Sequence, residues 1–165
     1  MVIDKFKKIM PEYQAYPESL RRNDDNYFFI TKDNKKKYLV VSGKKAKRFE
    51  GEFIAERTKL SSLNHNNAEL LKEIFPELSP VSSNLRTSFG FGDRLGLATP
   101  AHIECVRKHD NLFSVFAQQS VRELRRTGKS MQNVIDTVIW GYLETGYKGP
   151  YGADADHLKD ISSLN

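Results

Sequence analysis

The chain has 165 residues, of which 39% are hydrophobic and 28% are charged, so it can bury the core of one domain or slightly more. It has no apolar run long enough to span a membrane, its polar start differs from a secretory signal, and its single cysteine, Cys105, excludes an internal disulfide and a thiolate metal cluster. We therefore expect a cytoplasmic protein that does not act in a membrane.

The formal net charge of +5 is carried by the first half of the chain. Residues 1–86 hold 17 lysines and arginines against 12 acids, whereas residues 87–165 hold 9 of each. Lys32–Arg48 alone has eight basic residues and one acid, Asp33. Such a stretch could bind nucleic acid. We favour a lysine-rich hairpin that keeps a sheet edge soluble, because no nucleic-acid-binding motif accompanies the charges.

The first 57 residues predict little helix and one hairpin. Residues 1–26 lack periodicity and contain two prolines, so we expect only a short helix near Glu18–Arg22. Residues 27–31 and 37–41 are apolar runs rich in β-forming residues, and the turn residues between them predict a β-hairpin. Residues 49–57 fit either a further strand or a short helix.

A clearer helical pattern precedes the best candidate for a domain boundary. Asn64–Phe75 opens with residues that can cap a helix and continues with apolar residues at helical spacing. Pro76 ends this helix, and the serine-rich Pro80–Asn84 follows. We therefore predict an N-terminal α+β region over residues 1–84 and a second region over residues 85–165.

The second region alternates strands and helices. We expect strands near 87–92, 112–117 and 152–156, a helix over 100–108 capped by Thr99, and a longer helix capped by Ser130. Strands joined in this way are parallel, with right-handed crossovers. The predicted class is therefore α/β, with the α+β region and its hairpin followed by the first three βα units of a TIM-barrel-like (β/α) fold.

Polar side chains collect where each of these predicted strands ends. In a (β/α) barrel, the carboxyl ends of the strands carry the active site. Because neighbouring residues of a strand alternate faces, at most one of the two adjacent glutamines should point into such a site. The three groups are Asp93 and Arg94, then Gln118, Gln119 and Ser120, and finally Asp156, His157 and Lys159.

The last of these groups has the most specific chemistry. In an extended strand, Asp154 and Asp156 would share a face, and His157 follows directly. A helix cap or a solvated turn is the simpler interpretation of an Asp-x-Asp-His sequence. A carboxylate beside an imidazole also suits a divalent cation, or a base next to a metal ligand.

Long stretches of the second region resemble the tagaturonate epimerase family of bacterial uronate catabolism. These stretches are SFGFGDRLGLATP at 88–100, VFAQQS at 115–120 and GADADHLK at 152–159. The resemblance is strong over about residues 87–159 and extends to the first half only in general layout. It implies a barrel-like, metal-dependent isomerase that interconverts the keto-uronic acids tagaturonate and fructuronate.

The resemblance also implies roles for individual residues. Asp156 would be the proton acceptor and His157 a ligand of a divalent metal, with manganese, nickel, zinc and iron all left open. Arg94 and Lys159 could bind the substrate carboxylate or pair with a neighbouring acid. Substrate-binding roles are further expected for Asp93, Gln118 and Gln119.

The chain departs from the family in length. Members of the family are considerably longer, three βα units cannot close a barrel, and one histidine cannot hold a catalytic metal that usually needs three protein ligands. The resemblance therefore implies an incomplete and inactive fragment, a truncated reading frame or one half of a split protein. Its partner would be the rest of the barrel or a second copy. A non-catalytic sugar-acid-binding module is the alternative, beside the nucleic-acid-binding one.

Overall fold

The computed structural model describes residues 2–109 and 111–156, the last two of these by their backbone alone. The chain divides into two compact units, which are Met1–Pro76 with Leu143–Gly146, and Glu77–Tyr142 with Tyr147–Asn165. The first division falls before the predicted boundary at residue 84. One unit holds an antiparallel sheet and the other a parallel sheet, so the mixed α/β class expected from the sequence is confirmed.

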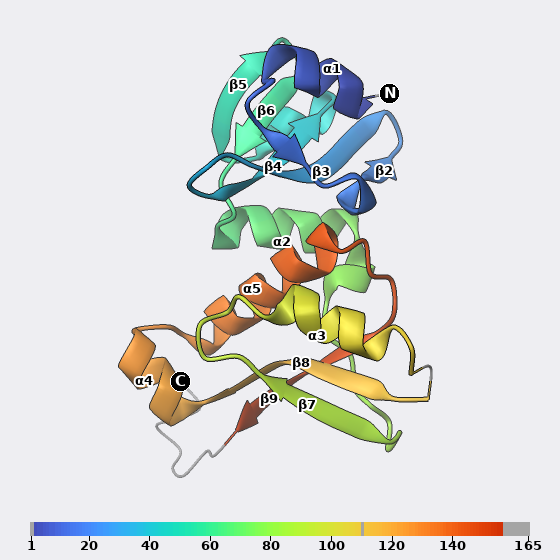
Figure 1. Ribbon diagram of the computed structural model, residues 1–165, viewed down its shortest axis with the longest axis vertical. Coiled ribbons are helices and arrows are strands. Elements are labelled where there is room, and N and C mark those ends of the chain that lie inside the picture. The colour runs from blue at the N-terminus through green and yellow to red at the C-terminus, as the bar shows by residue number, and fades with distance from the viewer. Residues whose placement is uncertain (1, 110, 157–165) are drawn as a thin grey trace. The chain divides into compact units, whose positions relative to one another are not determined.

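The first unit is built on a six-stranded antiparallel sheet (Figure 1). The strand order is β1-β3-β4-β6-β5, and β2 also pairs with β3. The expected hairpin is β3–β4, and Asp33 holds its turn by accepting the backbone N–H groups of Lys35 and Lys36 at 2.7 Å each. The strands are β1 (Gln14–Ala15), β2 (Arg21–Asn23), β3 (Asn26–Lys32), β4 (Lys37–Ser42), β5 (Gly51–Ala55) and β6 (Thr58–Ser61).

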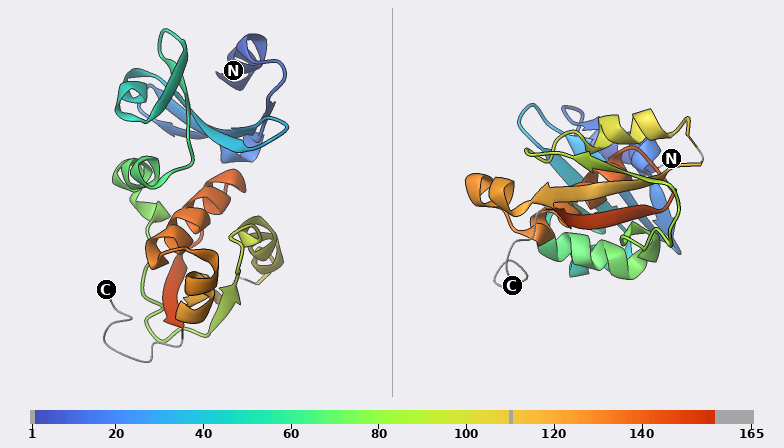
Figure 2. Two further views of the ribbon diagram at one scale, coloured as in Figure 1. Left: turned by 90° about the vertical axis from the view of Figure 1, so that its left-hand side faces the viewer. Right: turned by 90° about the horizontal axis from the view of Figure 1, so that it is seen from below.

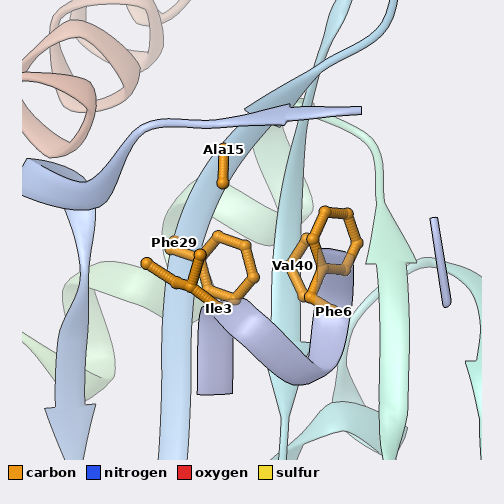
Figure 3. Close-up of a cluster of buried hydrophobic side chains, with 5 residues drawn as sticks. All are labelled: Ile3, Phe6, Ala15, Phe29 and Val40. Carbon is orange, nitrogen blue, oxygen red and sulfur yellow. The ribbon is translucent and has the colours of Figure 1, made fainter. Parts of the chain in front are cut away.

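The start of the chain differs from the expectation. Helix α1 (Val2–Ile9) was not foreseen, and the helix expected near Glu18–Arg22 is instead a 3-10 turn, η1 (Pro17–Ser19), followed by β2. The buried Ser19 hydroxyl accepts the N–H of Ile30 at 2.7 Å, which ties this segment to β3. One face of the sheet packs on α1 through a buried cluster of Ile3, Phe6, Ala15, Phe29 and Val40 (Figure 3).

Helix α2 (His65–Ile74) forms where the periodicity predicted it. The side chain of Asn64 caps it by accepting the N–H of Asn67 at 3.0 Å. Phe75, just after this helix, packs edge-on against Phe28 with ring centroids 5.2 Å apart. Phe28 and its neighbour Phe29 are both fully buried, which is the continuous burial of a central strand.

Much of the basic stretch is engaged within the first unit. It includes the turn between β3 and β4 and the 3-10 helix η2 (Lys44–Arg48). Arg48 pairs with Glu73 at 2.6 Å, Lys45 with Asp24 at 3.5 Å, and the Lys36 ammonium lies 5.0 Å from the centre of the Tyr38 ring. These contacts favour the hairpin interpretation over a nucleic-acid surface. Among the helices that the structure describes, none is long and apolar enough to cross a membrane.

The second unit is a three-stranded parallel sheet in the order β7-β8-β9 (Figure 2). Each of its strands starts within one residue of the start predicted from the sequence. The helices α3 and α5 were also predicted, whereas the short helix α4 was not. Thr99 is the first residue of α3 rather than its cap, whereas the Ser130 hydroxyl accepts the Asn133 N–H at 3.2 Å, as a cap does. The elements are β7 (Ser88–Gly92), α3 (Thr99–Val106), β8 (Phe113–Ser120), α4 (Val121–Thr127), α5 (Met131–Glu144) and β9 (Tyr151–Asp156).

Helices α3 and α5 pack on the same face of this sheet. Phe91 of β7 lies against His102 of α3 at 5.1 Å between ring centroids, and Tyr151 of β9 lies against Tyr142 of α5 at 5.5 Å. The two helices touch, because a Cβ added at Gly141 of α5 would lie 2.7 Å from Cβ of Thr99. The opposite face carries Gly90, Val115 and Gly152 together with Phe113, whose ring would lie 2.8 Å from a Cβ added at Gly152.

Strand β8 contains one more residue than either neighbour over the same length. Val115 pairs with Gly90 and with Gly152, but Gln118 pairs with Gly92 and Ala117 with Ala153. This bulge changes the alternation of side chains. As a result, Gln118 lies over Gly90 on the face that also carries Val115, whereas regular alternation would place it with Phe116.

Candidate active site at the carboxyl edge of the parallel sheet

The carboxyl ends of the three parallel strands bring most of the predicted site residues to one edge of the second unit. Asp93 and Arg94 follow β7, Gln118 and Gln119 lie near the end of β8, and Asp156 ends β9. Asp156 pairs through its backbone with Ser120, so the ends of β8 and β9 are level. His157 and Lys159 lie outside the described residues, as does the side chain of Asp156.

Gln118 and Asp154 form a polar pair across β8 and β9. Nε2 of Gln118 donates to Oδ2 of Asp154 at 3.3 Å, and the exposed carboxylate of Asp154 keeps further acceptor capacity. A Cβ at Gly90 would lie 2.6 Å from Cδ of Gln118, so a larger residue there would require the end of the Gln118 side chain to move. This pair gives the site hydrogen-bonding groups of a kind that suits a polyhydroxylated substrate.

Asp93 closes the loop between β7 and α3. Its carboxylate accepts three backbone N–H groups, from Leu95 at 3.1 Å, Gly96 at 2.9 Å and Ala98 at 2.5 Å. Its backbone carbonyl also accepts Nε2 of the buried Gln119 at 3.0 Å. Both side chains therefore shape the edge of the site, and their expected role as substrate ligands stays a prediction.

Arg94 pairs with a neighbouring acid, which was one of its two expected alternatives. Its Nε lies 2.5 Å from Oε2 of Glu123, a residue of the unforeseen helix α4, and Arg126 approaches the other oxygen of Glu123 at 3.4 Å. Arg94 is 63% exposed and Glu123 only 14%, so the acid is the anchored partner. The guanidinium is thereby held at the rim of the site.

A small cavity lies beneath the loop that Asp93 closes. It has a volume of about 10 Å³, which is room for one water molecule and far too little for a sugar acid. Both Gln118 and Gln119 line it, so the expectation that at most one of them faces the substrate stays a prediction. Lys129, which the sequence did not single out, also lines it and donates to the carbonyl of Leu95 at 2.6 Å. A substrate must therefore bind outside this cavity.

The groups at this edge fit a divalent cation in kind but not in number. Asp93 already accepts three backbone N–H groups and Glu123 pairs with two arginines, which leaves Asp154 as the most available carboxylate among the described side chains of the edge. A catalytic metal usually has three protein ligands. Asp154 and His157 together would fall short of that set.

Replacing Asp93 by alanine is expected to destabilise the second unit by about 2 kcal/mol, because three backbone N–H groups lose their acceptor. The measurement is urea unfolding followed by the fluorescence of Trp140, the single tryptophan, which lies in α5. Arg94→Gln breaks only an ion pair with one exposed partner and should cost less than about 1 kcal/mol. Equal unfolding midpoints for the two variants would contradict the loop-closing role.

Comparison with known proteins gives one consistent result. The sequence model of the family described as tagaturonate epimerase matches residues 16–165. Tagaturonate/fructuronate epimerase of Thermotoga maritima is 45% identical over 170 aligned residues, which cover 99% of this chain and 35% of the relative. Crystal structures of fructuronate-tagaturonate epimerase from Cohnella laeviribosi, native and with one glycerol, superpose with a TM-score of 0.87 at 34% identity. Each structure matches 99% of this chain. The matched part makes up 34% of the chain in the native structure and 33% of the chain in the glycerol complex.

Proposed function

The chain belongs to the tagaturonate epimerase family, and we propose that it supplies the proton acceptor and one metal ligand of an enzyme that interconverts tagaturonate and fructuronate. The observation that carries this proposal is the match to these epimerases over 99% of the chain. The chain spans about a third of the length of the curated relative. The proposal therefore concerns a site that further sequence completes.

The arrangement of the second unit supports a place for it in a (β/α) barrel. Its strands lie in consecutive order with α3 and α5 on one face, whereas a doubly wound sheet would have helices on both faces. Gly90, Val115 and Gly152 would then line the interior of the barrel. Further strands must come from outside this chain, because three strands cannot close a barrel.

The proposed reaction inverts the carbon at which tagaturonate and fructuronate differ, which lies two bonds from the ketone carbon. The carboxylate of Asp156 would remove the proton of the hydroxyl group on that carbon, while the bond to the carbon beside the ketone breaks and its electrons move onto the ketone oxygen. The aldehyde formed in this way would present its other face before the same bond forms again, and a second acid would return the proton to the new hydroxyl group. The configuration of one carbon inverts, and no electrons are gained or lost. A divalent cation, with His157 among its ligands, would stabilise the negative charge on the ketone oxygen.

The neighbouring residues would bind and orient the sugar acid. Gln118 and Asp154 offer hydrogen bonds to its hydroxyl groups from the face that would line the barrel. The candidates that would bind the substrate carboxylate are Lys159 and Arg94, which Glu123 holds at the rim. A guanidinium and an ammonium both form charge-assisted hydrogen bonds with a carboxylate. Asp93 and Gln119 would act through the loop that they support.

The test compares the chain alone with a chimera in which residues 1–165 replace the matching segment of the Thermotoga maritima relative. We expect the chimera to convert tagaturonate to fructuronate and the 165-residue chain to be inactive, because three strands cannot close a barrel around the site. NMR spectra of the sugar acids give the rates, and the parent relative is the positive control.

The outcomes separate the competing interpretations. A chimera that folds and binds metal but does not epimerise would refute the proposal. Saturable binding of the sugar acid by such a chimera would instead favour a non-catalytic sugar-acid-binding module. If the 165-residue chain epimerised the substrate unaided, its dependence on further sequence would be refuted.

A further inference from the structure

A second cavity lies at the amino edge of the parallel sheet, opposite the candidate active site. Its volume is about 580 Å³, within the range of small-molecule sites. It is lined by the segments that lead into the three strands, with Arg86 before β7, His109 and Leu112 before β8, and Lys148 before β9. The proposed reaction uses none of these residues.

The described lining of this cavity is basic and contains no acid. Arg86, Arg107, His109 and Lys148 line it together with apolar residues. Arg107 is compensated by Glu104, with Nε and Oε1 2.7 Å apart. In the described part of the chain, the side chains of His109 and Lys148 have no hydrogen-bond or ion-pair partner. Uncompensated cations that share one concave surface raise the local concentration of anions.

The described groups that fix Arg86 in place do not neutralise it. Its Nε donates to the carbonyl of Ser83 at 2.8 Å and its Nη2 to the carbonyl of Ser82 at 3.3 Å. The central carbon of the guanidinium lies 4.3 Å from the centre of the Phe113 ring. Carbonyls and an aromatic face orient an arginine but leave it a full positive charge. An arginine ordered in this way is prepared for a further, anionic partner.

Part of the lining of this cavity is apolar, and we call this part its apolar floor. It consists of Val106, Leu112, Phe113 and Pro150. Such a surface can cover the carbon skeleton of a small molecule while the cations bind its charged end. Several cations around one position suit the dianionic, three-oxygen end of a phosphomonoester better than a single carboxylate.

We propose that this amino-edge cavity binds a phosphate group, either free or carried by a small phosphorylated metabolite, at a site separate from the sugar-acid site. Arg86 and Lys148 are its principal cations. The two sources of phosphate share these contacts and differ in their use of the apolar floor.

The experiment is an NMR titration of the 165-residue chain with inorganic phosphate and, separately, with glucose 6-phosphate. Both should shift the amide signals of residues around Arg86, His109 and Lys148 in a saturable way, whereas sodium chloride at equal ionic strength should not. Tighter binding of the sugar phosphate would identify a phosphorylated metabolite as the ligand. Equal affinity would identify free phosphate.

The decisive variant is Lys148→Gln, because this exposed side chain has no described partner whose loss would affect folding. We expect its dissociation constant for phosphate to rise about tenfold, as loss of a charge-assisted hydrogen bond implies. Lys35→Gln removes the same charge from the hairpin of the first unit. This variant should leave the dissociation constant for phosphate unchanged. The absence of saturable shifts, shifts around Asp93 and Gln118 instead, or equal effects of the two variants would overturn the proposal.

Discussion

Replacing Asp156 by asparagine is expected to lower the rate of epimerisation by the chimera by roughly 10²- to 10⁴-fold, because an amide cannot accept the proton that a general base removes. The fold and the bound metal should be retained. His157→Ala should instead lower both activity and metal content, since it removes a ligand. The measurements are the initial rate of epimerisation and the metal content of the purified protein.

Asp154→Asn is the matched control for this experiment. It removes the same charge two residues earlier in β9, from a side chain that accepts a hydrogen bond from Gln118. If Asp154 only orients the substrate, this variant should raise KM and keep most of kcat. Substantial activity of Asp156→Asn, or a larger loss of kcat in Asp154→Asn, would show that the base has been assigned to the wrong carboxylate.

Phe116→Ala should produce the largest loss of stability, about 3–5 kcal/mol. Phe116 is 2% exposed and lies at the centre of the second unit, with ring centroids of Phe91 at 5.5 Å, Tyr147 at 5.9 Å and Tyr151 at 6.3 Å. Removing its ring leaves a cavity between the sheet and its helices. Urea unfolding followed by Trp140 fluorescence would measure the change.

Phe89→Ala is the control for this variant. Phe89 lies on the neighbouring strand and contacts Phe91 at 5.0 Å, but its side chain is 56% exposed. Its truncation should cost about 1 kcal/mol or less, because little apolar surface is returned to water. If both variants shifted the midpoint equally, the sheet would not be stabilised mainly by the cluster around Phe116.

Patterns in the sequence were sufficient to predict most of the long helices and strands. The apolar runs of β3 and β4 and the helical spacing of α2 and α5 indicated these elements. Helix α1 was missed although Ile3, Phe6 and Ile9 recur at helical spacing, because the helix is only 8 residues long. Helix α4 has a single buried residue, Leu124, and therefore shows no periodicity. Its start could have been found, since Ser120 and Glu123 have the spacing of a capping box.

The candidate site could be predicted as a location but not as a set of contacts. The rule that parallel strands carry function at their carboxyl ends gathered Asp93, Arg94, Gln118 and Gln119. That Asp93 would be saturated by the amides of its own loop, or that Arg94 would meet Glu123, depends on loop and helix geometry that spacing does not encode. Sequence patterns identify which strand ends meet, whereas the direction of each side chain depends on the local backbone.

The extra residue in β8 has a consequence for how this family can change over evolution. Loss of one residue between Val115 and Gln118 would remove the bulge and place Gln118 two residues after Val115, so regular alternation would keep it on the face of Gly90 and Asp154. Such a deletion would preserve the polar pair, and its cost would fall on the buried residue that is lost, Phe116 or Ala117. We therefore expect relatives without the extra residue to keep the polar pair and to differ in how this strand packs on its helices.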